Sequence, residues 1–96
     1  MTPTEIIKLD AERNGVSPTK VISYIKPDLK NGNATLFQVG DSVLVMKMIA
    51  PFIAEPHLFT IEPVRKLIES IKELVQKVDE LLTNLEQHIT LANLLG

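Results

Sequence analysis

The apolar residues of this 96-residue chain change their spacing twice, from a helical period to a β pattern and then to a heptad repeat. Residues 1–33 carry the first pattern, residues 34–61 the second and residues 62–96 the third. A chain of this length suffices for one domain, so we expect residues 1–96 to form a single unit. The predicted fold class is α+β: two short N-terminal helices, a three-stranded antiparallel meander and a long C-terminal amphipathic helix.

The N-terminal third contains two helix-start signals. Thr2-Pro3-Thr4-Glu5 can form a capping box with proline in the first turn, which predicts a helix from about Pro3 to Asn14 that Gly15 ends in the left-handed conformation. Ser17-Pro18 repeats the signal for a second helix.

That second helix should run through Val21, Ile22 and Ile25. We expect it to fail around Pro27, because proline lacks the N–H that the helix ladder needs. Lys30-Asn31-Gly32-Asn33 is then predicted to be a turn.

The middle of the chain is dense in β-branched and aromatic residues. Ala34 to Val39 and Ser42 to Ile49 flank Gly40-Asp41, which predicts an antiparallel hairpin with a two-residue turn. After a connection from Ala50 to Ala54, Pro56 to Ile61 is predicted to pair with the second strand. The expected result is a three-stranded meander.

The last third has the most regular pattern. Apolar residues occupy nine of ten heptad a and d positions, which are Val64, Leu67, Ile71, Leu74, Val78, Leu81, Leu85, His88, Ala92 and Leu95. The e positions Ile68, Val75, Leu82 and Ile89 are apolar as well, so the stripe is wide enough for one face on the sheet and one on another helix. A helix of this length would extend about 50 Å, beyond a domain built from the rest of the chain.

Two interpretations of this helix are open. A break at the weak helix formers Thr83-Asn84 would fold it back on itself as two antiparallel helices. The absence of a Gly or Pro turn and the continuing heptad phase favour a continuous helix that associates with other copies of the chain. The residues expected in that oligomer interface are Leu74, Val78, Leu81, Leu82, Leu85, Ile89, Leu91, Leu94 and Leu95.

Composition narrows the function classes. The chain has no cysteine, so it can form neither a disulfide nor a thiolate metal site. Its longest apolar run, Val43 to Ile53, is interrupted by Lys47 and Pro51, so we expect a soluble protein without a membrane span. The net charge of −2 is evenly spread, which disfavours nucleic-acid binding because that binding depends on clustered Lys and Arg.

Few residues qualify for chemistry. His57 could act with Glu62 or Asp41, and His88 lies at a heptad position, but neither has the spacing of a metal or acid–base motif. We read both as structural and expect no catalytic, cofactor-binding or metal-ligating residue. Ala11 to Ser17 has the spacing of the turn in a helix-turn-helix motif. The helix after this turn would be the recognition helix, and its residues Lys20, Ser23, Tyr24 and Lys26 would face DNA.

Two segments carry a resemblance. Gly40-Asp41-Ser42-Val43-Leu44-Val45 and Glu55-Pro56-His57-Leu58-Phe59-Thr60, preceded by Leu9 to Pro18, resemble the GNAT-type acetyltransferase-like proteins of tailed bacteriophages over about residues 5–78. The resemblance implies half of that fold, with pantetheine along the strand Pro56 to Ile61 and the coenzyme A pyrophosphate at the helix from Pro63.

The chain departs from this family where the pyrophosphate would bind. Thr60-Ile61-Glu62-Pro63 has no glycine, Pro63 removes a donor and Glu62 adds a negative charge. The sequence therefore predicts a non-catalytic, homo-oligomeric structural or assembly protein, which the resemblance places in the host cytoplasm during phage assembly and then in the virion with other phage structural proteins. The alternatives are an acyl-CoA-dependent N-acetyltransferase remnant with a site completed across subunits, and a small helix-turn-helix DNA-binding regulator.

Overall fold

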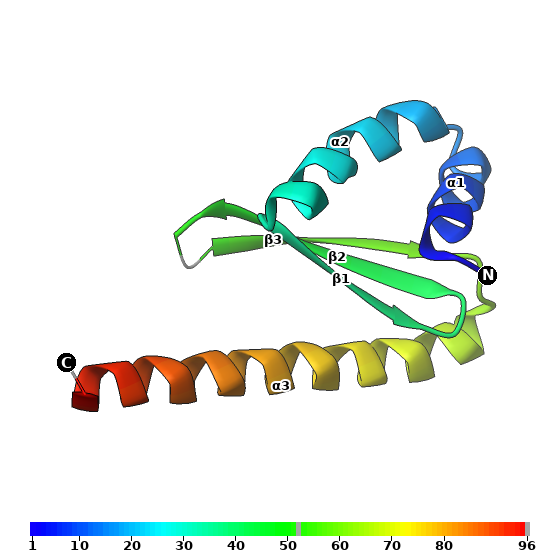
Figure 1. Ribbon diagram of the computed structural model, residues 1–96. Coiled ribbons are helices and arrows are strands. Elements are labelled where there is room, and N and C mark those ends of the chain that lie inside the picture. Colours follow the sequence, from blue (N-terminus) through cyan, green and yellow to red (C-terminus); the bar gives the residue numbers. More distant parts are fainter. Residues whose placement is uncertain (52, 96) are drawn as a thin grey trace.

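The computed structural model describes the backbone of residues 1–51 and 53–95 and the side chains of residues 1–51 and 53–83 (Figure 1). Its elements are α1 (Pro3–Arg13), α2 (Pro18–Asn31), β1 (Ala34–Val39), β2 (Ser42–Ala50), β3 (Ile53–Thr60) and α3 (Val64–Leu95). The α+β class, the two N-terminal helices, the meander and the long C-terminal helix are confirmed.

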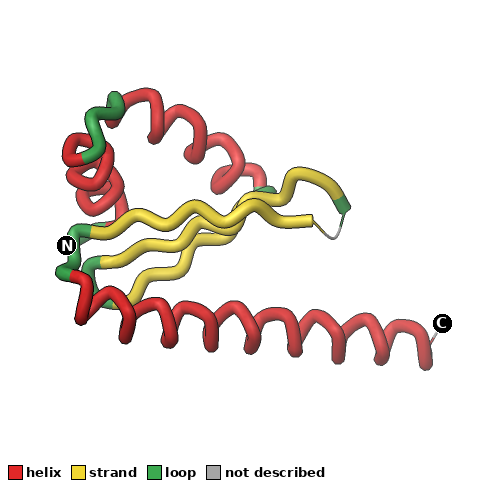
Figure 2. The backbone as a smooth tube through the Cα atoms, turned by 180° about the vertical axis from the view of Figure 1, so that it is seen from behind, coloured by secondary structure: helices red, strands yellow, loops and turns green. Residues whose placement is uncertain are grey.

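The three strands form an antiparallel sheet in the order β1-β2-β3, with Phe37 opposite Leu44 and Val45 opposite His57. The helices α1 and α2 cover one face of this sheet, and α3 runs along the other face (Figures 1 and 2). Of the three strands, α3 packs mainly against β1 and β2. The molecule thus has three layers, with the sheet in the middle.

The larger core lies between the sheet and the first two helices. Alternate residues of β2 point into it, and Val43 and Val45 are almost completely buried there. The other buried residues of this core are Ile6, Ile7, Ile25, Ala34 and Phe59, with Val21, Ile22, Leu29 and Leu36 packed around them. Burial of these apolar side chains holds α1 and α2 on the sheet.

The opposite face of the sheet is covered by one side of α3. On this side, Leu74 is 1% exposed and Ser70 is 5% exposed. At about 1.5 Å per residue the 32-residue α3 is about 48 Å long, whereas the nine-residue strand β2 spans about 30 Å. The C-terminal part of α3 therefore extends past the sheet (Figure 1).

The predicted helix ends are partly right. The Thr2 and Glu5 capping box is present, and Gly15 adopts a φ of 69° after α1. The expected failure of α2 at Pro27 is wrong, because the helix continues to Asn31 and ends at Gly32, whose φ is 78°. Pro27 removes one ladder bond, to the carbonyl of Ser23, and both residues are exposed, so water can satisfy that carbonyl.

Two boundaries further along the chain also differ from expectation. The third strand begins at Ile53 instead of Pro56, with an irregular register between Met48 and Ala50. The possible break at Thr83-Asn84 does not occur, since α3 is continuous through it. Thr83 Oγ1 donates a hydrogen bond to the Asp79 carbonyl at 2.9 Å, which accommodates this weak helix former within the helix.

We expect Leu74→Ala to lower the free energy of unfolding by about 2–5 kcal/mol, because it leaves a cavity between α3 and the sheet. Urea denaturation followed by circular dichroism measures this loss. Gln76→Ala, at an exposed position two residues further along the helix, is the control and should change stability little. A loss below about 1 kcal/mol for Leu74→Ala would mean that α3 is not anchored by this side chain.

Candidate functional site

The junction between β3 and α3 is a hydrogen-bonded corner. Glu62 is 6% exposed, and its carboxylate points into the protein, away from solvent. Its Oε1 atom accepts hydrogen bonds from Ser42 Oγ at 2.5 Å and from Ser70 Oγ at 2.9 Å. One carboxylate oxygen therefore ties the start of β2 to the second turn of α3.

Further polar contacts complete this corner. Thr60 Oγ1 lies 2.7 Å from Ser42 Oγ and accepts a hydrogen bond from the Glu62 N–H at 3.0 Å. The Thr60 N–H donates to Asp10 Oδ1 of α1 at 3.2 Å. Side chains and backbone from α1, β2, β3 and α3 thus meet at the junction that the resemblance assigns to a pyrophosphate.

The turn between β1 and β2 closes over the same carboxylate. A Cβ atom at Gly40 would lie 3.3 Å from Glu62 Oε1, and Gly40 has a φ of 56° that favours glycine. Glu62 Oε2 is buried and makes no hydrogen bond to the described part of the chain. The structure thus gives a reason for an acidic residue at position 62, where the resemblance implies a phosphate-binding turn. The Glu62 side chain is a buried hydrogen-bond acceptor that fixes the direction of α3.

A second polar cluster lies on the α2 side of the sheet. Lys47 Nζ is 3.0 Å from Asp28 Oδ2 and 3.5 Å from the centre of the Tyr24 ring. The hydrogen bond to Asp28, followed by the contact with Tyr24, raises the pKa of Lys47. This cluster joins α2 to β2 by an ion pair and a cation–π contact.

His57 belongs to this cluster and does not meet the partners proposed from the sequence. Its ring packs edge-on against the Tyr24 ring, with the two ring centroids 5.8 Å apart. Its Nε2 atom lies 2.6 Å from Glu55 Oε1, a close contact that lacks hydrogen-bond geometry. Glu62 bonds to Ser42 and Ser70 at the corner instead of to His57. His88 lies outside the residues whose side chains the structure describes.

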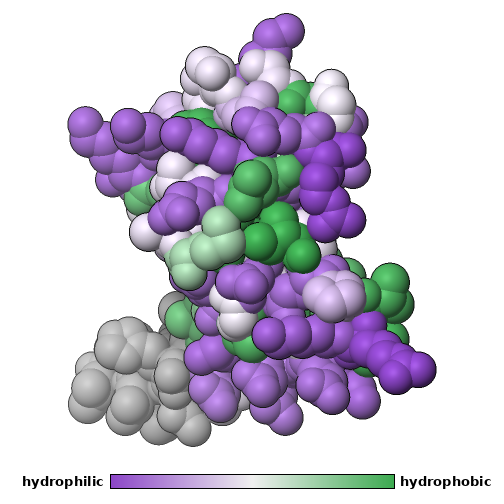
Figure 3. Space-filling view, turned by 90° about the vertical axis from the view of Figure 1, so that its right-hand side faces the viewer, coloured by the Kyte–Doolittle hydropathy of each residue, from purple (hydrophilic) through white to green (hydrophobic). Residues whose placement is uncertain are grey.

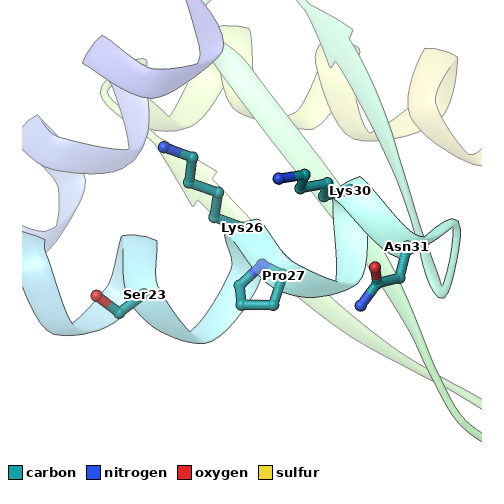
Figure 4. Close-up of a pocket in the computed structure, with 5 residues that line it drawn as sticks. All are labelled: Ser23, Lys26, Pro27, Lys30 and Asn31. Carbon is teal, nitrogen blue, oxygen red and sulfur yellow. The ribbon is translucent and has the colours of Figure 1, made fainter.

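Several hollows adjoin α2. A pocket of about 270 Å³ is lined by Lys20, Val21, Tyr24, Ile25, His57 and Phe59. A wider one of about 510 Å³ is lined by Ser23, Lys26, Pro27, Lys30 and Asn31. Figure 4 shows all five of these residues on α2, with Lys26 and Lys30 extending on the same side of the helix.

These hollows bear on the helix-turn-helix alternative. Tyr24, one of the four residues expected to face DNA, contacts His57 and Lys47 of the sheet. Lys20 and Tyr24 line the smaller hollow, whereas Ser23 and Lys26 line the wider one. Tyr24 is therefore already in contact with side chains of the sheet, whereas a recognition helix would present all four residues to the groove.

The described residues of the expected oligomer interface differ in accessibility. Leu74 is 1% exposed within its own chain, so its side chain is not available to a second copy, and Val78 is half-buried. Leu81 and Leu82 are exposed, at 37% and 52%. Leu85, Ile89, Leu91, Leu94 and Leu95 lie outside the described side chains.

A second set of residues on α3, which the expected interface does not include, is left uncovered by the sheet. Val64, Ile68, Ile71 and Val75 are all exposed, at 38% to 73%. Hydrophobic side chains are visible on one flank of the lower part of the molecule, where α3 lies (Figure 3). The sequence shows the apolar row at Ile68, Val75 and Leu82, but it does not show that this row, instead of the one containing Leu74, is left free of the sheet.

None of the helices in the described part of the chain combines the length and the apolar content that a bilayer crossing requires. Within the same residues, His, Asp and Glu side chains form no group of three that could hold a metal ion.

We expect Glu62→Ala to lower the free energy of unfolding by about 1–3 kcal/mol, because two buried hydroxyl groups lose their acceptor. Glu62→Gln keeps one acceptor oxygen and should cost less. Urea titration of both variants measures the difference. Equal stability of Glu62→Ala and the wild type would show that the corner does not hold α3 in place.

The Lys47 contacts predict a dependence on high pH. A lysine whose pKa is raised by folding stabilises the fold below its unfolded value of about 10.5, and this contribution is lost as pH rises through the higher folded pKa. The stability difference between the wild type and Lys47→Met should be constant from neutral pH to about 10 and should shrink above it. An unchanged difference above pH 11 would contradict the assignment.

Comparison with models of known protein families gives no match to the chain, and neither curated proteins nor solved structures give one.

Proposed function

We propose that this chain is a non-catalytic structural or assembly protein that functions as a homo-oligomer through α3. The observation that carries the proposal is the row of exposed apolar residues on a continuous 32-residue helix. Val64, Ile68 and Val75 are each more than half exposed, and they lie on one side of the helix. Apolar residues gathered in this way usually mark an interface.

The different sides of α3 are suited to different contacts, and this supports self-association. One side of the helix carries Leu74 and Ser70 and is already used within the chain. A neighbouring side carries the exposed apolar residues, and the outer side carries exposed charged residues such as Glu69 and Glu80. A helix with this arrangement packs on its own sheet and on a second helix at the same time.

The virion assignment rests on a different argument, which is the resemblance of residues 5–78 to bacteriophage acetyltransferase-like proteins. In this proposal the helical pair and the sheet are a docking block, and α3 connects copies of it within a phage particle. Glu62 supports a role without coenzyme A, because its carboxylate is committed to Ser42 and Ser70.

We expect the wild-type chain to sediment above its monomer mass of 10.7 kDa at micromolar concentration. Val75→Lys should sediment as a folded monomer, because each copy would bring a charged side chain into the helix–helix contact. The substitution leaves the sheet-facing side of α3 unchanged. Gln76→Lys, on the polar side of the helix, is the matched control and should keep the wild-type mass.

A wild-type chain that stays at 10.7 kDa up to 100 μM, about the upper end of the range expected for a specific association, would overturn the oligomer proposal. A Val75→Lys variant that remains oligomeric would place the interface elsewhere on the chain.

A further inference from the structure

Most of the exposed apolar residues on the described part of α3 lie in a single seam. We call Val64, Ile68, Ile71, Val75, Val78 and Leu82 the α3 flank; they are spaced alternately by four and three residues along the helix. This alternation is the pattern of a helix–helix seam, in which each residue fits between residues of the facing helix. The flank is displaced around the helix from the row of Leu67, Leu74 and Leu81, in which Leu74 is buried.

The outer edge of β3 is poorly suited to bind a second copy. The Met48 N–H donates to the Asn33 carbonyl, so the even-numbered residues of β2 bond to β1 and the odd-numbered ones bond to β3. On β3, the backbone N–H and C=O groups of the even-numbered residues therefore point away from β2, towards the open edge of the sheet. Pro56 has no N–H to offer there, and the Thr60 N–H is already bonded to Asp10.

Charged residues beside the α3 flank indicate which partner fits it. Arg65, Lys72 and Asp79 follow Val64, Ile71 and Val78, and each is exposed at the border of the flank. Their charges change sign along the helix, from positive at Arg65 and Lys72 to negative at Asp79. In the sequence, Glu86 follows Leu85 in the same way, so two positive positions are succeeded by two negative ones.

We infer that the α3 flank binds the α3 flank of a second copy in antiparallel orientation, with Lys72 of each chain opposite Asp79 of the other. This inference rests on the proposed oligomerisation and adds its partner, direction and register. The dimer places Val75 against Val78 of the partner and Ile71 against Leu82 of the partner.

The charge pattern selects this arrangement over its neighbours. Moving one helix by a heptad in either direction would place Lys72 opposite Lys72 of the partner or Asp79 opposite Asp79 of the partner, and both are like-charge contacts. In a parallel pair, the charged border of one helix would face the border of the other that carries Leu67, Leu74 and Leu81. Leu74 is buried in its own chain, so that border offers no charged partner.

The register is tested by exchanging the two charges in the full-length chain. Lys72→Glu and Asp79→Lys should each weaken dimerisation by about tenfold at low salt, because the twofold axis turns every substitution into two like-charge pairs. The double variant Lys72→Glu/Asp79→Lys should return to within about threefold of the wild-type dissociation constant. Glu73→Lys, a charge reversal outside the border, is the matched control and should have little effect.

Helix direction is tested separately by double electron–electron resonance, for which the absence of native cysteine is an advantage. A spin label at Lys66→Cys lies on the exposed side of α3, away from the flank. In the antiparallel register, residue 66 is level with residue 87 of the partner, so the two labels are separated by about 32 Å along the helix axis. A parallel pair would hold the labels at the same level, about 20 Å apart or less.

The outcomes separate this inference from the proposed function. A dimer with the long label distance and rescue by the charge exchange supports the antiparallel register. A dimer or higher oligomer with the short distance, or without rescue, overturns the register and leaves the oligomer proposal standing. A chain that is monomeric throughout overturns both.

Discussion

The structure depends on how one side of α3 is fixed against the sheet. Leu74 and Ser70 are buried there, and the Ser70 hydroxyl donates to Glu62, which also accepts from Ser42 at the start of β2. These contacts determine the rotation of the helix about its own axis. Once that rotation is fixed, the apolar stripe is divided into a part that the sheet covers and a part that it leaves exposed.

The two faces of the sheet are covered unequally as a result. On one face, α1 and α2 enclose a core with several fully buried side chains. On the other, a single helix packs mainly against β1 and β2, and Leu58 of β3 keeps 41% of its surface exposed. One helix is too narrow to cover three strands, and this explains why apolar surface remains beside α3 and why we assign it to a second copy.

Local signals in the sequence predicted most of the fold. The capping box at Thr2 and Glu5, the glycine turns and the period change at Ala34 each act over a few residues, and the structure has all of them. Pro27 misled the prediction because a proline costs a helix one bond, and a helix with the proline on its exposed side and a good C-terminal glycine tolerates that cost. Position in the sequence could not show that Ser23 and Pro27 lie on the exposed side of α2.

The site was less predictable. That Glu62 departs from a phosphate-binding turn is visible in the sequence, but its bonds to Ser42 and Ser70 depend on the meeting of β2 with α3. The width of the apolar stripe was also visible, whereas its division between sheet and flank was not. Leu74 is buried and Val75 is exposed although the two residues are consecutive in the chain. Only the docking of α3 decides which of these two side chains faces the sheet.

The most direct test of the account is an isotope-filtered NOE measurement on a mixture of labelled and unlabelled chains, which detects contacts between copies only. A contact between two α3 flanks predicts intermolecular NOEs at the methyl groups of Ile68, Ile71 and Val75 and none at Leu74. If these methyl groups give no intermolecular NOE at high protein concentration, the α3 flank does not contact a second copy.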